Sequence, residues 1–201
     1  MIAAHIPFVQ TNFILGLDCD EGAEPFELTK RFIDLTPGIY HAFSLFTCYG
    51  RASPLNLELQ RAGRVNAMAF HFLDSNHGMN IRPLNYAWPE FYDRVADLTR
   101  YAMGARAVWR RLAANGLGAV GLFNLFRGAT TGRPRYQAAM ARMMRKDRGI
   151  RAYFEGESDT MPGFFEARIR NDLGPLWEAL PAGALSHDPY AYLNSEVEAA
   201  A

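Results

Sequence analysis

The sequence has few of the features that mark the common enzyme classes. Its two cysteines, Cys19 and Cys48, are too few for a disulfide framework or a cysteine-bound cluster, and a reducing cytoplasm is the expected location. It contains no Gly-rich phosphate loop, no Gly-x-Ser-x-Gly and no Ser-His-Asp order, so hydrolase and nucleotide-loop functions have no support. Residues 1–5 have neither a basic nor a long apolar region, and we expect no signal peptide.

Charge and hydrophobicity restrict the possible partners. The longest apolar stretch, residues 117–126, is well short of the ~20 residues that span a bilayer. The chain has 21 Lys and Arg against 21 Asp and Glu, and this zero net charge gives no bulk attraction to nucleic acid or to a membrane. We expect neither as a partner. With 201 residues, 49% of them hydrophobic, the chain can bury a core.

The stretch from Phe8 to Glu21 predicts a buried strand that ends in an acidic turn. A near-continuous apolar run at 13–17 is typical of a strand covered on both faces, and acids follow it at Asp18, Asp20 and Glu21. A helix over 24–35 and a second apolar strand over 39–46 complete a βαβ unit. Phe26, Thr29 and Ile33, together with Leu28, Phe32 and Leu35, give this helix its apolar face. The sequence therefore predicts an α/β fold with parallel strands.

After the second strand the sequence becomes progressively helical. Ser53 and Pro54 favour the start of a helix that ends near Gly63, and residues 65–86 predict a loop with one or two short strands. An apolar stripe from Trp88 to Leu112, which includes Trp109, predicts one continuous helix over 89–113. Further helices are expected over 117–126, 134–146, 149–154 and 164–180. We place a domain boundary near residue 86, between segments 1–86 and 87–201.

Two motifs in the first segment follow its predicted strands. The first comprises Ile14, Gly16, Asp18 and Asp20, and the second comprises Gly50, Ser53, Pro54, Leu55, Gly63 and Arg64. In these residues the segment resembles the late barrel strands of radical S-adenosylmethionine (SAM) proteins, most of all the subgroup that often carries a cobalamin-binding domain. In that family a strand ending Ile-x-Gly-x-Asp leads into a helix, and the next strand ends in a proline-containing turn and a short helix closing with Gly-Arg. The resemblance extends more loosely to about Gly156.

The resemblance implies a partial (β/α) barrel followed by a helical C-terminal region. It places Asn12, Gly16, Asp18 and Cys48 on the rim beside SAM, with Asn12 standing where the family often has glycine and Cys48 where it has proline. The family's Cys-x3-Cys-x2-Cys, which holds a [4Fe–4S] cluster, has no counterpart here. We therefore expect no catalytic residue, no metal ligand and no cofactor for this chain alone, and the missing half of the barrel or a second copy as its partner.

Each candidate residue also has a structural interpretation. The acids could cap the following helix, and Cys48 could be a small buried residue. His71, Asp74 and His77 could hold a metal, although their spacing fits no helical ligand pattern. The basic segment from Arg127 to Arg151 could bind phosphates or form a solvated face.

Two functions fit these observations. In the first, the chain is the C-terminal segment of a radical SAM enzyme and is inactive alone. In the second, it is a binding or scaffolding module that kept the fold and lost the reaction. The sequence leaves open whether the chain takes part in catalysis.

Overall fold

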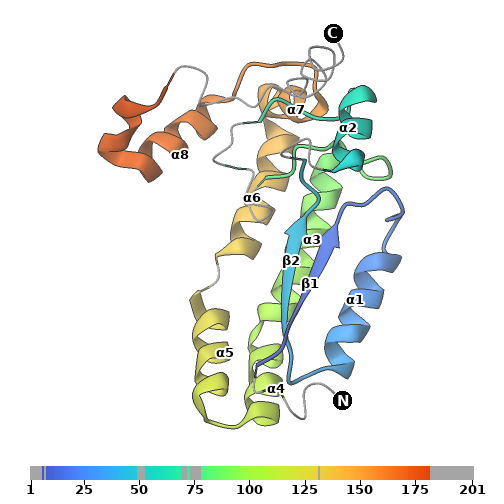
Figure 1. Ribbon diagram of the computed structural model, residues 1–201, viewed down its shortest axis with the longest axis vertical. Coiled ribbons are helices and arrows are strands. Elements are labelled where there is room, and N and C mark those ends of the chain that lie inside the picture. The colour runs from blue at the N-terminus through green and yellow to red at the C-terminus, as the bar shows by residue number, and fades with distance from the viewer. Residues whose placement is uncertain are drawn as a thin grey trace. The chain divides into compact units, whose positions relative to one another are not determined.

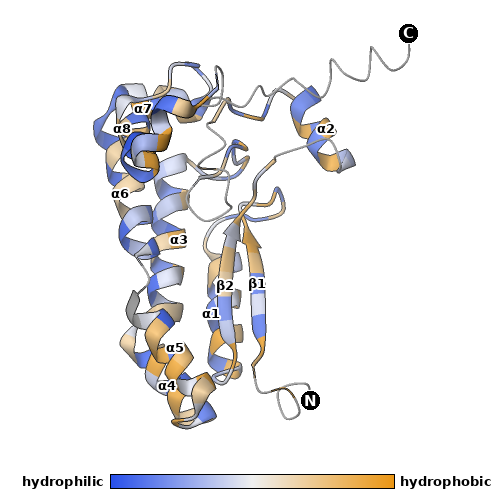
Figure 2. Ribbon diagram, turned by 60° about the vertical axis from the view of Figure 1, so that its left-hand side comes forward, coloured by the Kyte–Doolittle hydropathy of each residue, from blue (hydrophilic) through white to orange (hydrophobic). Residues whose placement is uncertain are grey.

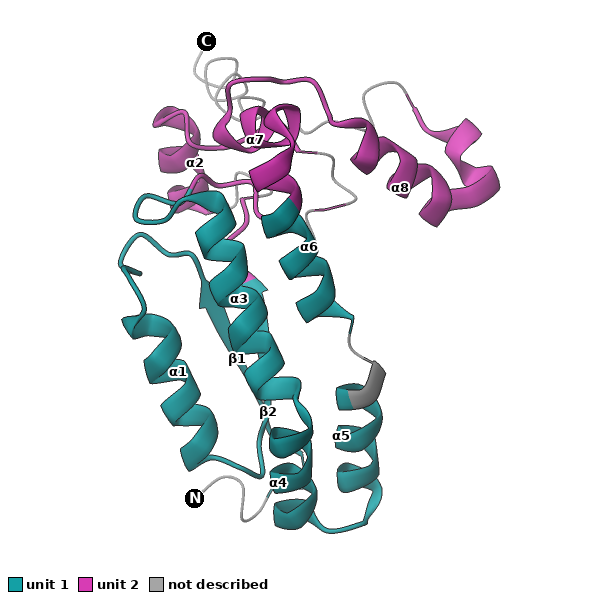
Figure 3. Ribbon diagram, turned by 180° about the vertical axis from the view of Figure 1, so that it is seen from behind, with its two compact units in different colours: residues 1–44, 83–142 teal, residues 45–82, 143–201 magenta. Residues whose placement is uncertain are grey.

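The computed structural model describes residue 6 and residues 8–48, 53–68, 72, 78–130 and 132–181. The chain divides into two compact units, each made from two stretches (Figure 3). Unit 1 comprises residues 1–44 and 83–142, and unit 2 comprises residues 45–82 and 143–201. The predicted change from mixed to helical structure is present: in the described part of the chain, all regular elements from residue 88 onward are helices.

Unit 1 is organised around a pair of parallel strands. β1 (Gln10–Leu15) and β2 (Tyr40–Leu45) run in the same direction and are joined by α1 (Glu24–Leu35) (Figure 1). The Phe13 and Phe43 rings stack with centroids 6.0 Å apart, and Thr11 Oγ1 lies 2.7 Å from His41 Nδ1. The predicted α/β class and parallel pair are therefore confirmed. In the described residues the sheet has these two strands, and the partial barrel stays a prediction.

The two strands are covered very differently. All residues of β2 except Ser44 are buried, whereas the residues of β1 alternate along the strand. Thr11, Phe13 and Leu15 are half-buried or buried, but Gln10, Asn12 and Ile14 are exposed, and Ile14 keeps 52% of its surface in water. Parallel strands are normally covered on both faces. β1 departs from this rule, since the described residues leave one of its faces open.

Helix α1 covers the other face with a narrower stripe than its sequence predicts. Phe26, Thr29 and Ile33 are buried as expected. Leu28, Phe32 and Leu35, which were predicted to add to the same face, are exposed. In a helix these three positions lie to one side of the buried stripe, beyond the width that two strands can cover.

The predicted long helix over 89–113 is wrong, because it is two helices. α3 (Trp88–Met103) and α4 (Ala105–Asn115) meet at Gly104, whose extended ψ of 164° interrupts the helical backbone. A Cβ at Gly104 would lie 2.7 Å from the Arg100 carbonyl oxygen, so only glycine fits this corner. The apolar stripe is buried along α3, but Trp109 in α4 is exposed, since the break turns it away from the core.

The remaining helices lie close to their predicted positions. They are α2 (Pro54–Arg61), α5 (Ala119–Thr130), α6 (Arg133–Lys146), α7 (Arg148–Glu155), α8 (Gly163–Leu173) and the 3-10 helix η3 (Gly174–Ala179). Pro54 occupies the first turn of α2 as expected, but the Ser53 side chain makes no capping hydrogen bond. Asp147 does cap its helix: its Oδ1 accepts hydrogen bonds from the N–H groups of Gly149 and Ile150.

A polar cluster ties the helices of unit 1 together where α1 ends. The Asp34 carboxylate accepts hydrogen bonds from Tyr101 of α3, at 2.7 Å, and from Arg110 of α4. The Tyr101 hydrogen bond, and then the Arg110 guanidinium, lower the pKa of Asp34. Nearby, Asn115 Nδ2 donates to the Gly38 carbonyl at 3.0 Å. These bonds hold α3 and α4 against the connection between α1 and β2.

In unit 2, one arginine joins the C-terminal ends of two helices. Arg82 donates from its guanidinium to the carbonyl of Gly63, just after α2, and to that of Glu155 at the end of α7. Carbonyls at helix ends carry partial negative charge and lack partners within the helix, so a cation between two such ends stabilises both. Gly156, at φ +73°, closes α7 against the same guanidinium.

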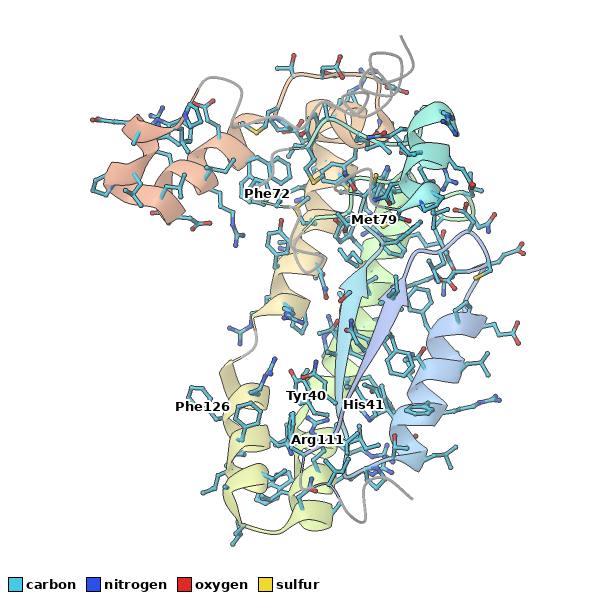
Figure 4. All side chains as sticks on the ribbon, in the orientation of Figure 1. Tyr40, His41, Phe72, Met79, Arg111 and Phe126 are labelled. Carbon is cyan, nitrogen blue, oxygen red and sulfur yellow. The ribbon has the colours of Figure 1, made fainter. Side chains whose placement is uncertain are left out.

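The core of unit 2 combines an asparagine clamp with an aromatic cluster. Asn80 is fully buried, and its side chain accepts from the Cys48 N–H at 2.9 Å and donates to the Cys48 carbonyl at 2.6 Å. Phe72 packs edge-on against Phe165, and both Tyr153 and Phe154 contact Phe165. Figure 4 labels Phe72 of this cluster and Met79, the neighbour of Asn80 in the chain. The Asn80 side chain bonds both backbone groups of Cys48, as the backbone of a neighbouring strand would.

Replacing Asn80 by Ala should destabilise the protein severely. The change leaves a buried N–H and a buried carbonyl of Cys48 without partners, at a cost of about 3 kcal/mol in the free energy of unfolding. Urea denaturation of the full chain measures this cost. The matched control is Asn171→Ala, an exposed position in α8, for which we expect a change below about 0.5 kcal/mol. A loss under about 1 kcal/mol for Asn80→Ala would show that the clamp is dispensable.

Candidate functional site

The acidic turn after β1 is closed by one of its own carboxylates. Gly16 takes φ +88°, and Asp20 Oδ2 accepts hydrogen bonds from the N–H groups of Gly16 at 3.0 Å and Leu17 at 3.2 Å. The Asp20 N–H in turn donates to the Leu17 carbonyl. The positive φ explains the glycine in this strand end. The interpretation of Asp20 as a cap for α1 is corrected: Ala23 is the N-cap residue, and no side chain caps the helix.

Two residues in the connection just before α3 hold this turn in place. Asn85 Nδ2 donates to the carbonyls of Asp18 and Asp20, at 3.0 and 3.1 Å, and the Tyr86 hydroxyl donates to the Gly22 carbonyl at 3.0 Å. The sequence did not predict this role for Asn85. Nothing in a local pattern indicates a contact across 65 residues.

The turn is acidic, and its charge acts on a neighbouring tyrosine. Burial is the main cause of the raised pKa of the Tyr86 hydroxyl; the charge of Asp20 adds to it, and the charge of Arg94 opposes it. Cys19, between two of the acids, is exposed. The negative charge of this turn repels anions and favours a cationic group such as an amine or a sulfonium.

The other two predicted site residues lie in different surroundings. Asn12 is on the open face of β1, where its amide pairs with the Ser44 hydroxyl at 3.2 Å in both directions. Cys48 belongs to unit 2 and has no exposed surface, and the clamp from Asn80 engages its backbone. This placement fits the interpretation of Cys48 as a small buried residue. Gly16 and Asp18 are the two predicted residues that share the acidic turn.

His71, Asp74 and His77 lie outside the described residues. Within those residues, no group of three or more His, Cys, Asp or Glu side chains is arranged to hold a metal ion. None of the helices in the described segments is long and apolar enough to cross a bilayer.

The basic segment from Arg127 to Arg151 is mainly a solvated face. Arg135, Arg142 and Arg145 are exposed, while Met140 and Met144 are fully buried beneath them. Arg127 is the exception, because its guanidinium lies 4.4 Å from the centre of the Tyr40 ring in a cation–π contact.

His41 is the buried titratable group of the sheet. Thr36 Oγ1 donates to the Phe32 carbonyl, so it accepts from His41 Nε2–H at 3.3 Å, and the Thr11 hydroxyl then donates to Nδ1. Burial lowers the pKa of His41 to about 4, and the charge of Arg111 acts in the same direction. Figure 4 labels His41 with Arg111 and Tyr40 at this end of the sheet. The two hydroxyls thus satisfy both ring nitrogens of a neutral, buried imidazole.

Comparison with known proteins gives no relative: no protein family, no curated protein and no solved structure matches the chain.

Acid should destabilise the protein through His41. The unfolded chain binds this proton near pH 6.5 and the folded chain only near pH 4. The resulting stability is therefore complete above pH 6.5 and declines as the pH falls toward 4, by about 3 kcal/mol. We expect His41→Leu to remove this part of the pH dependence of the free energy of unfolding, and Thr11→Val to retain it because the imidazole stays buried. Equal pH profiles for wild type and His41→Leu would contradict the assignment.

Proposed function

We propose that the chain forms one wall of a radical SAM-type β/α barrel, acts in the cytoplasm and is inactive until a partner supplies the rest of the barrel. The observation that supports this most is the open face of β1. Gln10, Asn12 and Ile14 stay exposed while β2 is buried, although parallel strands are covered on both faces in complete folds. A further strand beside β1 would also use its second backbone edge, which pairs with no other strand among the described residues.

The family uses an iron–sulfur cluster and SAM, and the residues of this chain fit only the second of these. Cys19 is exposed and Cys48 is buried, and two thiols of this kind cannot hold an iron–sulfur cluster. The cluster, which supplies the electron for SAM cleavage in the family, therefore belongs to the partner in this proposal. The acidic turn suits the positive sulfonium and amino groups of SAM. Its role here is to orient that ligand through the negative charge of Asp18.

A second function, a binding or scaffolding module that has lost the reaction, rests on a different observation. The N–H groups of Gly16 and Leu17, which face the cofactor side in the resembling family, are both bonded to Asp20. A turn that satisfies its own donors has less need of a ligand. In this case β1 pairs with a second copy or with another protein.

Co-expression with the coding sequence that lies upstream in the same reading frame separates the two functions. The first predicts an upstream Cys-x3-Cys-x2-Cys segment, a stable complex that is brown after anaerobic purification, and cleavage of SAM by the complex but not by either part. The second predicts a colourless, monodisperse oligomer of this chain.

Ile14→Arg should disrupt the complex in either case, because it places a charge on the open face of β1. Leu176→Arg, at an exposed leucine of η3, is the matched control and should leave assembly unchanged. Size-exclusion chromatography with light scattering measures both. SAM cleavage by this chain alone would refute the proposal.

A further inference from the structure

Helix α5 packs with its smallest residues toward its neighbour. A Cβ added to Gly121 would lie 3.1 Å from Leu112 Cδ1, and one added to Gly128 would lie 2.4 Å from Val108 Cγ2, so both glycines face α4. Asn124 falls on the same stripe and is 1% exposed. The close approach of α4 and α5 therefore depends on the small side chains of α5, which lie against Val108 and Leu112 of α4.

The large apolar residues of α5 point away from α4. Leu122, Leu125 and Phe126 are 54%, 41% and 66% exposed. Because a helix advances about 100° per residue, these three residues share an arc of about 100°. Leu117, in the turn between the helices, and Trp109 of α4 are also exposed. Figure 2 shows α5 as a mostly hydrophobic helix.

This arrangement is the reverse of a normal surface helix, which buries its large apolar side chains and exposes its polar ones. Small residues inside and large apolar residues outside are typical of helices whose surroundings are not water. A cluster of this kind on a folded domain marks a contact surface. We therefore expect a partner to cover the apolar arc of α5, which consists of Leu122, Leu125 and Phe126.

The charge of the surrounding sequence identifies that partner. Between Asp97 and Asp147 the chain has no acidic residue and ten basic ones. These are Arg100, Arg106, Arg110, Arg111, Arg127, Arg133, Arg135, Arg142, Arg145 and Lys146. Arg111 is buried, and Arg100 and Arg110 are paired with Asp97 and Asp34, so the positive surface depends on the other basic residues. Since the whole chain is neutral, the acidic residues are concentrated elsewhere, and the zero net charge conceals a strongly positive segment that contains the apolar arc.

We propose that the hairpin of α4 and α5 lies on the surface of an anionic lipid bilayer, with Leu122, Leu125 and Phe126 among the acyl chains and the flanking arginines at the headgroups. Helices of 11 and 12 residues are too short to span a bilayer but suit an interfacial position. A second copy of the chain would bring two positive surfaces together, and a nucleic acid would leave the leucines in water. This contact departs from the expectation drawn from net charge, and it does not rest on the proposed barrel.

Vesicle sedimentation tests the proposal with the full chain. We expect binding to vesicles of phosphatidylcholine with phosphatidylglycerol, weak binding to phosphatidylcholine alone, and loss of binding at high salt. Leu122→Glu with Leu125→Glu should abolish binding, whereas Leu84→Glu, at an exposed leucine outside the helices of unit 1, should not. Arg133→Gln and Arg135→Gln should each weaken binding about 5-fold, which corresponds to about 1 kcal/mol for one basic residue near the surface.

A second measurement does not depend on variants that could misfold. Lipids brominated along their acyl chains should quench the fluorescence of exposed Trp109 when the protein is bound, and Trp109→Phe should remove that quenching while binding persists. Three results would overturn the proposal: no binding to anionic vesicles, equal binding to neutral ones, or a dimer that disappears with Leu122→Glu and Leu125→Glu. None of these results bears on the barrel experiment, which does not involve lipid.

Discussion

The incomplete cover of a parallel strand pair is the constraint on which the rest of unit 1 depends. β2 is buried, but β1 has one open face and, among the described residues, pairs with no strand other than β2. Two parallel strands bury too little surface to be stable by themselves, so the helices carry much of the cohesion. Asp34 illustrates this, since it binds both Tyr101 and Arg110 across three helices. The same constraint makes an additional strand or a partner the simplest completion of the fold.

Polar side chains perform much of the long-range assembly within each unit. Asn85 fixes the acidic turn of unit 1, and in unit 2 Asn80 serves as a strand partner for Cys48 while Arg82 joins the ends of two helices. Each of these bonds satisfies backbone groups that regular structure leaves unpaired. They also limit which ligands the acidic turn can bind, because N–H groups that are already bonded within the turn cannot donate to a ligand.

The local patterns predicted most of the elements and little of the site. Hydrophobic periodicity and the acidic turn were enough to predict the βαβ unit, and apolar spacing predicted the later helices. The break at Gly104 was missed because the apolar stripe continues through it, whereas the cause is an extended backbone in contact with the Arg100 carbonyl. Asn85 was missed because its partners are distant in sequence. The apolar face of α5 was visible as a hydrophobic run, but only its packing against α4 shows that the large side chains point outward.

Hydrogen–deuterium exchange in β1 tests the central claim most directly. If the strand awaits a neighbour, the amides of Gln10–Leu15 that do not bond β2 exchange rapidly in the isolated monomer and become protected in the complex with the upstream segment or in an oligomer. Strong protection of every amide of β1 in the dilute monomer, unchanged by any partner, would mean that the sheet is already complete and would contradict this account.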